Sequence, residues 1–184
     1  MQKPLVERVV TIGGECMFES ANLWIRLGTS FQDSLKYCKG LLREPRKLLM
    51  GGPMSGWSQK SQQVPLIFSG SAILALPKEV AAADKVEPCI RCGDCLDVCP
   101  VDISPAMITL AAEADLFQEA EVFGLKACIE CGNCSYVCPS KRPMIELIRY
   151  GLANAEDPSN QYGTFEEFIS AGPPSQISQK LLFK

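Results

Sequence analysis

The sequence has 184 residues, of which 47% are hydrophobic, so the chain can bury a core and is not intrinsically disordered. Its net charge of −3 argues against a nucleic-acid-binding protein, and no nucleic-acid partner is expected. The N-terminus lacks the basic and apolar regions of a signal peptide. The longest apolar stretch, residues 64–77, is shorter than the roughly 18 residues of a membrane span. We therefore expect a cytoplasmic protein with no direct membrane span.

The first half of the chain predicts a small α+β unit. Short runs of β-branched and apolar residues lie between glycines and turn residues, which is typical of short strands. The strands are expected at residues 5–12, 22–27, 47–50, 64–68 and 71–76. A short helix is expected over residues 31–38. Thr29 or Ser30 can serve as its N-cap and Gly40 as its C-cap.

The second half predicts helices around two cysteine-rich runs. Residues 78–87 are charged and Ala-rich, which indicates a linker or a short helix. Good helix formers predict one or two helices over residues 105–122, where Pro105 suits a first helical turn, and another helix over residues 144–153. The tail from residue 156 carries Asp-Pro and Gly-Pro-Pro and is expected to be irregular. The predicted domains are residues 1–77 and 78–155, followed by a tail at residues 156–184.

Eight of the ten cysteines lie in two runs with the same spacing. CIRCGDCLDVCP (residues 89–100) and CIECGNCSYVCP (residues 128–139) match at eight of twelve positions, at an offset of 39. Each reads C-x2-C-x2-C-x3-C-P, the spacing of bacterial ferredoxins, in which the fourth cysteine binds the other cluster. The expected ligands of two 4Fe–4S clusters are Cys89, Cys92, Cys95 and Cys138 for the first, and Cys128, Cys131, Cys134 and Cys99 for the second.

This spacing has a physical reason. Three neighbouring thiolates in one loop can wrap one face of a cubane, and a fourth thiolate from the other run locks the two halves together. Four apolar side chains are expected to keep water from the clusters: Ile90, Ile129, Val98 and Val137. Structural zinc is the first alternative, but zinc sites usually combine two separated ligand pairs, and the chain has no histidine. A disulfide scaffold is the second, and it fits clustered cysteines poorly.

The remaining features give weaker signals. Cys16 and Cys38 lack metal-binding spacing and are expected to be buried in a core. The Gly-rich segment 51–56 is expected to form a tight turn rather than a phosphate-binding loop, and no constellation of catalytic residues is apparent. Residues 89–138 hold two Lys or Arg against eight Asp or Glu, a net charge of −6, which favours partners with basic or metal-rich faces. A basic group follows the second run and either faces an acidic partner or is a solvated helix face: Lys141, Arg142 and Arg149.

These blocks resemble the family of RnfC, the soluble subunit of the Rnf electron transport complex. The resemblance runs in order through PLVERVVTIGGE (4–15), RLGTS (26–30), KLLMGGPMSG (47–56) and both cysteine runs, as far as residue 151. It implies a fold of class α+β, in which a small β-grasp-like (SLBB) domain precedes a helical two-cluster ferredoxin-type domain. It also implies an electron-transfer subunit on the inner face of the cell membrane, with other subunits of an ion-translocating complex, including a ferredoxin-like subunit, as partners.

Full-length members of that family carry a larger N-terminal region that binds NADH and flavin, and this chain opens after it. FMN and NADH are therefore expected only if such a region precedes the chain, which would make the chain a fragment, a split subunit or a shortened protein. No catalytic site is assigned to its residues. Two alternatives remain: the iron–sulfur part of a soluble cobalamin reductase, which shares the architecture, and a binding module in which the clusters are structural.

Overall fold

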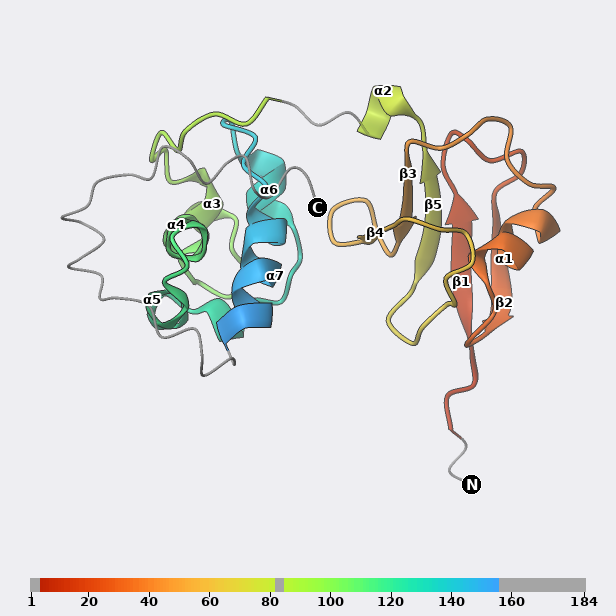
Figure 1. Cartoon of the computed structure of the whole chain (residues 1–184), viewed down its shortest axis with the longest axis horizontal. Coiled ribbons are helices and arrows are strands. Elements are labelled where there is room, and N and C mark those ends of the chain that lie inside the picture. The colour runs from red at the N-terminus through yellow and green to blue at the C-terminus, as the bar shows by residue number, and fades with distance from the viewer. Residues whose placement is uncertain (1–3, 82–84, 156–184) are drawn as a thin grey trace. The chain divides into compact units, whose positions relative to one another are not determined.

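The structure is a computed structural model that describes residues 4–81 and 85–155 (Figure 1). The predicted tail from residue 156 lies outside the described residues. The chain divides into two compact units, one ending at Asp84 and the other beginning at Lys85. Strands occur in the first unit and most of the helices in the second, so the prediction of a mixed α and β protein is confirmed.

The first unit is built on a five-stranded sheet. Its elements are β1 (Glu7–Gly13), β2 (Ala21–Arg26), α1 (Phe31–Tyr37), β3 (Lys47–Met50), β4 (Trp57–Gln59), β5 (Ala72–Leu76) and α2 (Lys78–Ala81). The strand order is β2-β1-β5-β3-β4. The strands β1 and β5 run parallel, and every other neighbouring pair is antiparallel.

One face of this sheet carries the core of the first unit. Side chains alternate between the two faces of a strand, so Val10 and Ile12 on β1 and Ile73 and Ala75 on β5 point to the same face and are fully buried. The helix α1 covers this face and adds Phe31, which is also fully buried. Burial of these apolar side chains holds the sheet and the helix together.

Residues 64–68 form no strand, so that prediction is wrong. This segment bonds to the residues around the start of α1 instead. The N–H of Phe31 donates to the carbonyl of Val64 at 3.0 Å, and the N–H of Leu66 donates to the carbonyl of Thr29 at 2.8 Å. Leu66 is thereby placed in the core, 1% exposed. The segment is apolar because it passes through the core beside the start of α1, and not because it forms a strand of the sheet.

The Gly-rich segment 51–56 forms the tight turn that the sequence predicts, between β3 and β4. Gly51 has a φ of 107°, in the left-handed region that favours glycine. The N–H of Gly56 donates to the carbonyl of Gly52 at 2.7 Å, and a Cβ on Gly56 would lie 2.4 Å from that oxygen. The strand β4 has no signal in the sequence, because it is three residues long and takes its conformation from pairing with β3.

The caps of α1 are predicted correctly at one end only. Ser30 is the N-cap, since its Oγ accepts the N–H of Asp33 at 3.1 Å. The predicted C-cap, Gly40, is wrong. Cys38 holds that position, Lys39 follows with a φ of 61°, and the N–H of Gly40 closes the turn on the carbonyl of Leu35 at 2.9 Å.

The second unit is helical. Its elements are α3 (Asp94–Asp97), α4 (Pro105–Glu113), α5 (Phe117–Val122), the 3-10 helix η1 (Leu125–Ala127), α6 (Asn133–Val137) and α7 (Met144–Ala155). The predicted helical region 105–122 is therefore two helices, and Pro105 stands in the first turn of α4 as expected. The helix α4 packs against α7, and Ile108, Ala111, Ile145 and Ile148 are buried in the core of the unit.

The duplication extends beyond the cysteine runs into the helices. The pairs α3 and α6, and α4 and α7, start at or close to an offset of 39, the same offset as the two runs. Residues with a left-handed backbone conformation also recur at this offset. Asp102 and Lys141, two residues after the prolines that close the runs, each have a φ of 52°. The second unit is thus made of two similar halves that wrap the cysteines.

Candidate metal centre

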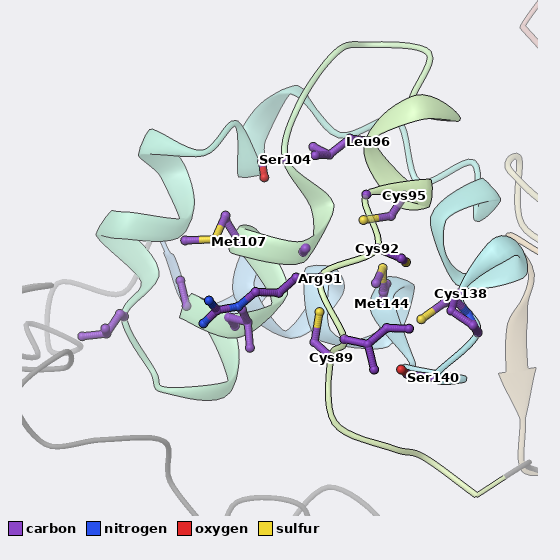
Figure 2. A pocket seen from close by; sticks show the side chains of 17 residues that line it. Cys89, Arg91, Cys92, Cys95, Leu96, Ser104, Met107, Cys138, Ser140 and Met144 are labelled. Carbon is purple, nitrogen blue, oxygen red and sulfur yellow. The ribbon is translucent and has the colours of Figure 1, made fainter.

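The eight cysteines of the two runs line two separate cavities. One cavity, of about 600 Å³, is lined by three cysteines of the first run and the last cysteine of the second (Figure 2). The other, of about 20 Å³, is lined by three cysteines of the second run and the last cysteine of the first. The two sets are Cys89, Cys92, Cys95 and Cys138, and Cys128, Cys131, Cys134 and Cys99. Each cavity therefore gathers one of the two predicted ligand sets.

The backbone of each run is turned by left-handed residues. Arg91 and Glu130, between the first two cysteines of each run, have φ values of 57° and 53°. Gly93 and Gly132 have φ values of 94° and 84° and precede α3 and α6. A left-handed residue other than glycine costs on the order of 1 kcal/mol or more. The same costly conformation at equivalent places in both halves indicates that the loop shape serves the cysteines.

The third cysteine of each run is buried, as is the fourth cysteine of the second run, Cys138. Cys95 and Cys134 are each 6% exposed, in the first turns of α3 and α6. Burial raises the pKa of the free Cys134 thiol to about 11, and burial also raises the pKa of Cys95 and of Cys128. These thiols are protonated at neutral pH when they are free. Metal binding must therefore displace their protons, which makes it favoured by higher pH.

The donor set fits an iron–sulfur cluster better than a single metal ion. Within residues 4–81 and 85–155, no three Cys, Asp or Glu side chains are grouped as ligands of one ion would be. A single zinc ion draws four thiolates to about 2.3 Å from one point. The cysteines here instead line two cavities, four to each. In a 4Fe–4S cluster each of the four thiolates binds a different iron atom, so they need not converge on one point.

The predicted shielding by Ile90 and Ile129 is confirmed in part, because each side chain lines one of the two cavities, whereas Val98 and Val137 are not among the residues that line them. Both isoleucine side chains are largely exposed, at 66% and 60%. The buried walls come instead from the helices. Met144 closes part of the first cavity, and Ile145 and Ile148 close part of the second, all with at most 3% exposure. The signal that sequence reasoning missed is the apolar face of α7, which begins five residues after the second run ends.

Both predicted alternatives for the basic residues after the second run, an acidic partner and a solvated helix face, are wrong for two of the three. Arg142 is buried and forms an ion pair with Glu113 of α4. Arg149 is 13% exposed, and its Nε donates to the Glu130 carboxylate at 2.6 Å. Lys141 is exposed. These arginines therefore hold the second unit together, and they do not form an exposed patch for an acidic partner.

Ser140 joins the two runs, a role with no signal in the sequence. Its Oγ donates to the carbonyl of Pro88 at 2.9 Å, and its own carbonyl accepts the N–H of Glu87 at 3.0 Å. The side chain is buried, and Ser140 lies two residues after Cys138. The chain entering Cys89 is thus held beside the chain leaving Cys138, and these two cysteines belong to the same cavity.

The two cysteines outside the runs are buried in the first unit, as predicted. Cys16 is fully buried and Cys38 is 3% exposed, both within the apolar core under the sheet. Burial raises the pKa of the Cys38 thiol. In the described parts of the chain, no helix combines the length and the apolar character that crossing a membrane requires.

Comparison with known proteins identifies the cysteine-rich unit. Residues 81–139 match the family described as the 4Fe-4S dicluster domain, which supports iron–sulfur binding by this unit. The match covers both cysteine runs.

Similarity to characterised proteins extends over both units. The chain is 45% identical over 148 residues to the C subunit of the proton-translocating ferredoxin:NAD(+) oxidoreductase complex of Clostridium ljungdahlii, covering 80% of the chain and 32% of that protein. It is 38% identical over 148 residues to the C subunit of the ion-translocating oxidoreductase complex of Rhodobacter capsulatus, covering 80% and 28%. A third relative, the C subunit of the Na(+)-translocating ferredoxin:NAD(+) oxidoreductase complex of Acetobacterium woodii, is 38% identical over 146 residues, covering 79% and 33%. The chain thus spans about a third of the length of these relatives.

Proposed function

We propose that the chain is the iron–sulfur electron-transfer part of the C subunit of an Rnf-type ion-translocating oxidoreductase, and that it relays electrons through two 4Fe–4S clusters. The observation that carries the proposal is the grouping of the eight cysteines. Two cavities each gather four thiols, three from one run and one from the other. A 4Fe–4S cluster bound by four thiolates accepts and gives up one electron at a time.

The residues around the clusters have separable tasks in this proposal. The first cluster is held by Cys89, Cys92, Cys95 and Cys138, and the second by Cys128, Cys131, Cys134 and Cys99. The left-handed loops direct backbone N–H groups inward, and one of them, the N–H of Glu130, already donates to the sulfur of Cys128 at 3.4 Å. Such N–H bonds and the apolar walls stabilise added negative charge and exclude water, which sets the reduction potential.

The first unit serves as a docking scaffold of SLBB, β-grasp-like type. The support is its architecture: a hairpin of β1 and β2, a parallel pair of β1 and β5, and one helix, α1, across one sheet face. The similarity to the relatives covers this unit as well as the cysteine-rich one. We propose domain bounds at residues 1–77 and 78–155, followed by a C-terminal segment at residues 156–184 that lies outside the described residues.

The partners follow from the relatives. Their names describe subunits of complexes that couple ferredoxin and NAD(+) to ion transport. The chain would therefore lie on the inner face of the cell membrane, among other subunits that include a ferredoxin-like one. NADH and FMN would bind in the part of such a subunit that this chain does not span.

Paired cysteine substitutions test the proposed ligand sets. The purified chain is loaded anaerobically with iron and sulfide, and iron content and the electron paramagnetic resonance of the reduced protein are recorded. We expect two clusters in the unchanged chain. If the fourth ligands cross, Cys99→Ser with Cys131→Ser affects a single cluster and leaves one. Cys99→Ser with Cys92→Ser affects both clusters and leaves none.

A second arm tests electron transfer itself. A reduced low-potential ferredoxin should reduce the loaded chain rapidly, whereas Cys38→Ala, a core substitution outside the runs, should leave that rate unchanged. If Cys99→Ser with Cys92→Ser retains one cluster, the crossed ligand sets are refuted. If the loaded chain is not reduced, the clusters are structural. Rapid corrinoid reduction with an added flavoprotein would favour the cobalamin-reductase alternative.

A further inference from the structure

The two cysteine cavities differ in size although ten of the seventeen residues that line the first have an equivalent in the lining of the second. The first is about 600 Å³ and the second about 20 Å³. One cause is the residue on the helix that follows each run. Ala106 of α4 lines the first cavity, and Ile145 of α7, 39 positions later, lines the second. The larger side chain fills space that the smaller one leaves open.

A second difference is an ion pair that ties the cysteine loop to the helix in the second half. Glu130 lies in the loop, directly before Cys131, and Arg149 lies on α7. The Nε of Arg149 donates to the Glu130 carboxylate at 2.6 Å, with the two side chains 13% and 32% exposed. A charge-assisted hydrogen bond in a partly buried place is stronger than one at the surface.

The first half has no ion pair at the equivalent positions. At an offset of 39, Arg91 takes the place of Glu130, and Leu110 of α4 takes the place of Arg149. Both line the first cavity, where Arg91 extends away from the cysteine sulfurs toward the side on which Met107 lies (Figure 2). Among the described residues, the Arg91 side chain has neither a hydrogen bond nor an ion pair.

The exposure of the second cysteine of each run follows the same difference, whereas the first and third cysteines are alike in the two runs, and the fourth ligand of the first cavity, Cys138, is more buried than Cys99 of the second. Cys92, directly after Arg91, is exposed, whereas the equivalent Cys131 is only partly exposed. The second cysteine of each run is the one closest to the residue that differs between the halves. An open loop beside Cys92 and a tied loop beside Cys131 give the two sites different access to solvent.

We propose that Glu130 and Arg149 are positioning residues that close the second cysteine loop onto α7 and shield the second cluster, whereas Arg91 and Leu110 leave the first cluster open to solvent. This inference rests on the proposed function, because it requires two clusters held by crossed ligand sets. The two clusters therefore have different roles. The first cluster is the one that a partner protein can approach, and the second is protected from water and oxidants.

Removal of the ion pair in the second half tests this inference. The full chain, loaded with both clusters, is mixed with an iron chelator, and iron release is followed over time. We expect two phases of equal size in the unchanged chain, a fast one from the first cluster and a slow one from the second. In the variant Glu130→Gln with Arg149→Leu, the slow phase should accelerate about tenfold and merge with the fast phase. A tenfold change in rate corresponds to about 1.4 kcal/mol.

The reverse exchange should do the opposite. Arg91→Glu with Leu110→Arg introduces the ion pair into the first half, so the fast phase should slow toward the slow one. Arg149→Lys retains a cation and should keep two phases. Glu121→Gln, which removes one partner of the Glu121–Lys126 ion pair elsewhere in the unit, should change neither rate. A purely structural weakening would accelerate both phases together, whereas the proposal requires that only one phase changes.

The outcomes separate this inference from the proposed function. A single release rate in the unchanged, fully loaded chain overturns the inference, as does an unchanged slow phase in Glu130→Gln with Arg149→Leu. If that variant fails to fold, the reverse exchange decides, because an unchanged fast phase there contradicts the inference independently. A chain that takes up fewer than two clusters refutes the proposed function instead.

Discussion

The two units of this protein owe their stability to different interactions. The first has a continuous apolar core beneath a sheet, in which Cys16 and Cys38 act as small apolar side chains. In the second, three cysteines of the runs belong to the core: Cys95, Cys134 and Cys138. Its core is therefore built around the cavities that the thiols line. We therefore expect metal binding to be coupled to folding in the second unit, and the first unit to fold independently of it.

Removal of iron should produce the largest difference between the two units. We expect chelation to unfold much of the second unit, because thiols at the centre of its core lose the group that they surround, while the sheet of the first unit persists. Amide hydrogen exchange measured by mass spectrometry reports each unit separately. Protection should fall over residues 85–155 and remain over β1 and β5. Equal loss of protection in both units would show that the first depends on the clusters too.

Loss of one ligand should have the next largest effect. Cys92→Ser or Cys131→Ser is expected to remove one cluster and to destabilise the other, because the proposed ligand sets cross between the halves. Iron and sulfide analysis of the purified variants checks the loss, and the melting temperature of the second unit checks the coupling. Cys16→Ala, in the other unit, is the control and should retain all the iron. Full iron content in either serine variant would contradict the crossed sets.

A core substitution in the first unit should destabilise that unit and leave the iron content of the second unchanged. Phe31→Ala removes a fully buried ring from the core under the sheet and should cost about 3–5 kcal/mol of unfolding free energy. Denaturation followed by the fluorescence of Trp24 and Trp57, both in this unit, measures the cost. Iron content should stay at the level of the unchanged chain. A parallel loss of iron would show that the two units unfold together.

The smallest effect should come from the contact between the two runs. Ser140→Ala removes the hydrogen bond to the Pro88 carbonyl and should cost about 1 kcal/mol. Because this contact holds the chain before Cys89, we expect faster iron release from the first cluster alone. Ser61→Ala, which removes a hydroxyl acceptor from an exposed loop of the first unit, is the matched control. An accelerated release from both clusters would indicate general loosening instead.

Much of the local structure could be predicted from the sequence. The strands at residues 5–12 and 71–76, the N-cap at Ser30 and the helix start at Pro105 agree with the structure within one or two residues. These features depend on neighbours in the chain, through side-chain alternation, capping and the fixed φ of proline. The segment 64–68 shows the limit, because its apolar residues serve a buried crossing as well as they would serve a strand.

The sequence by itself determined the chemistry of the site. Two copies of one cysteine spacing, without any histidine, predicted iron–sulfur binding and two ligand sets, and the assignment of individual ligands remains a prediction. Tertiary structure alone decided which charges are internal. Arg142 and Arg149 are indistinguishable from exposed residues in the sequence, yet their partners, Glu113 and Glu130, lie 29 and 19 positions away. Cysteine spacing is a local constraint that a short loop must satisfy, whereas these ion pairs exist only after the chain has brought Arg142 to α4 and α7 to the second cysteine loop.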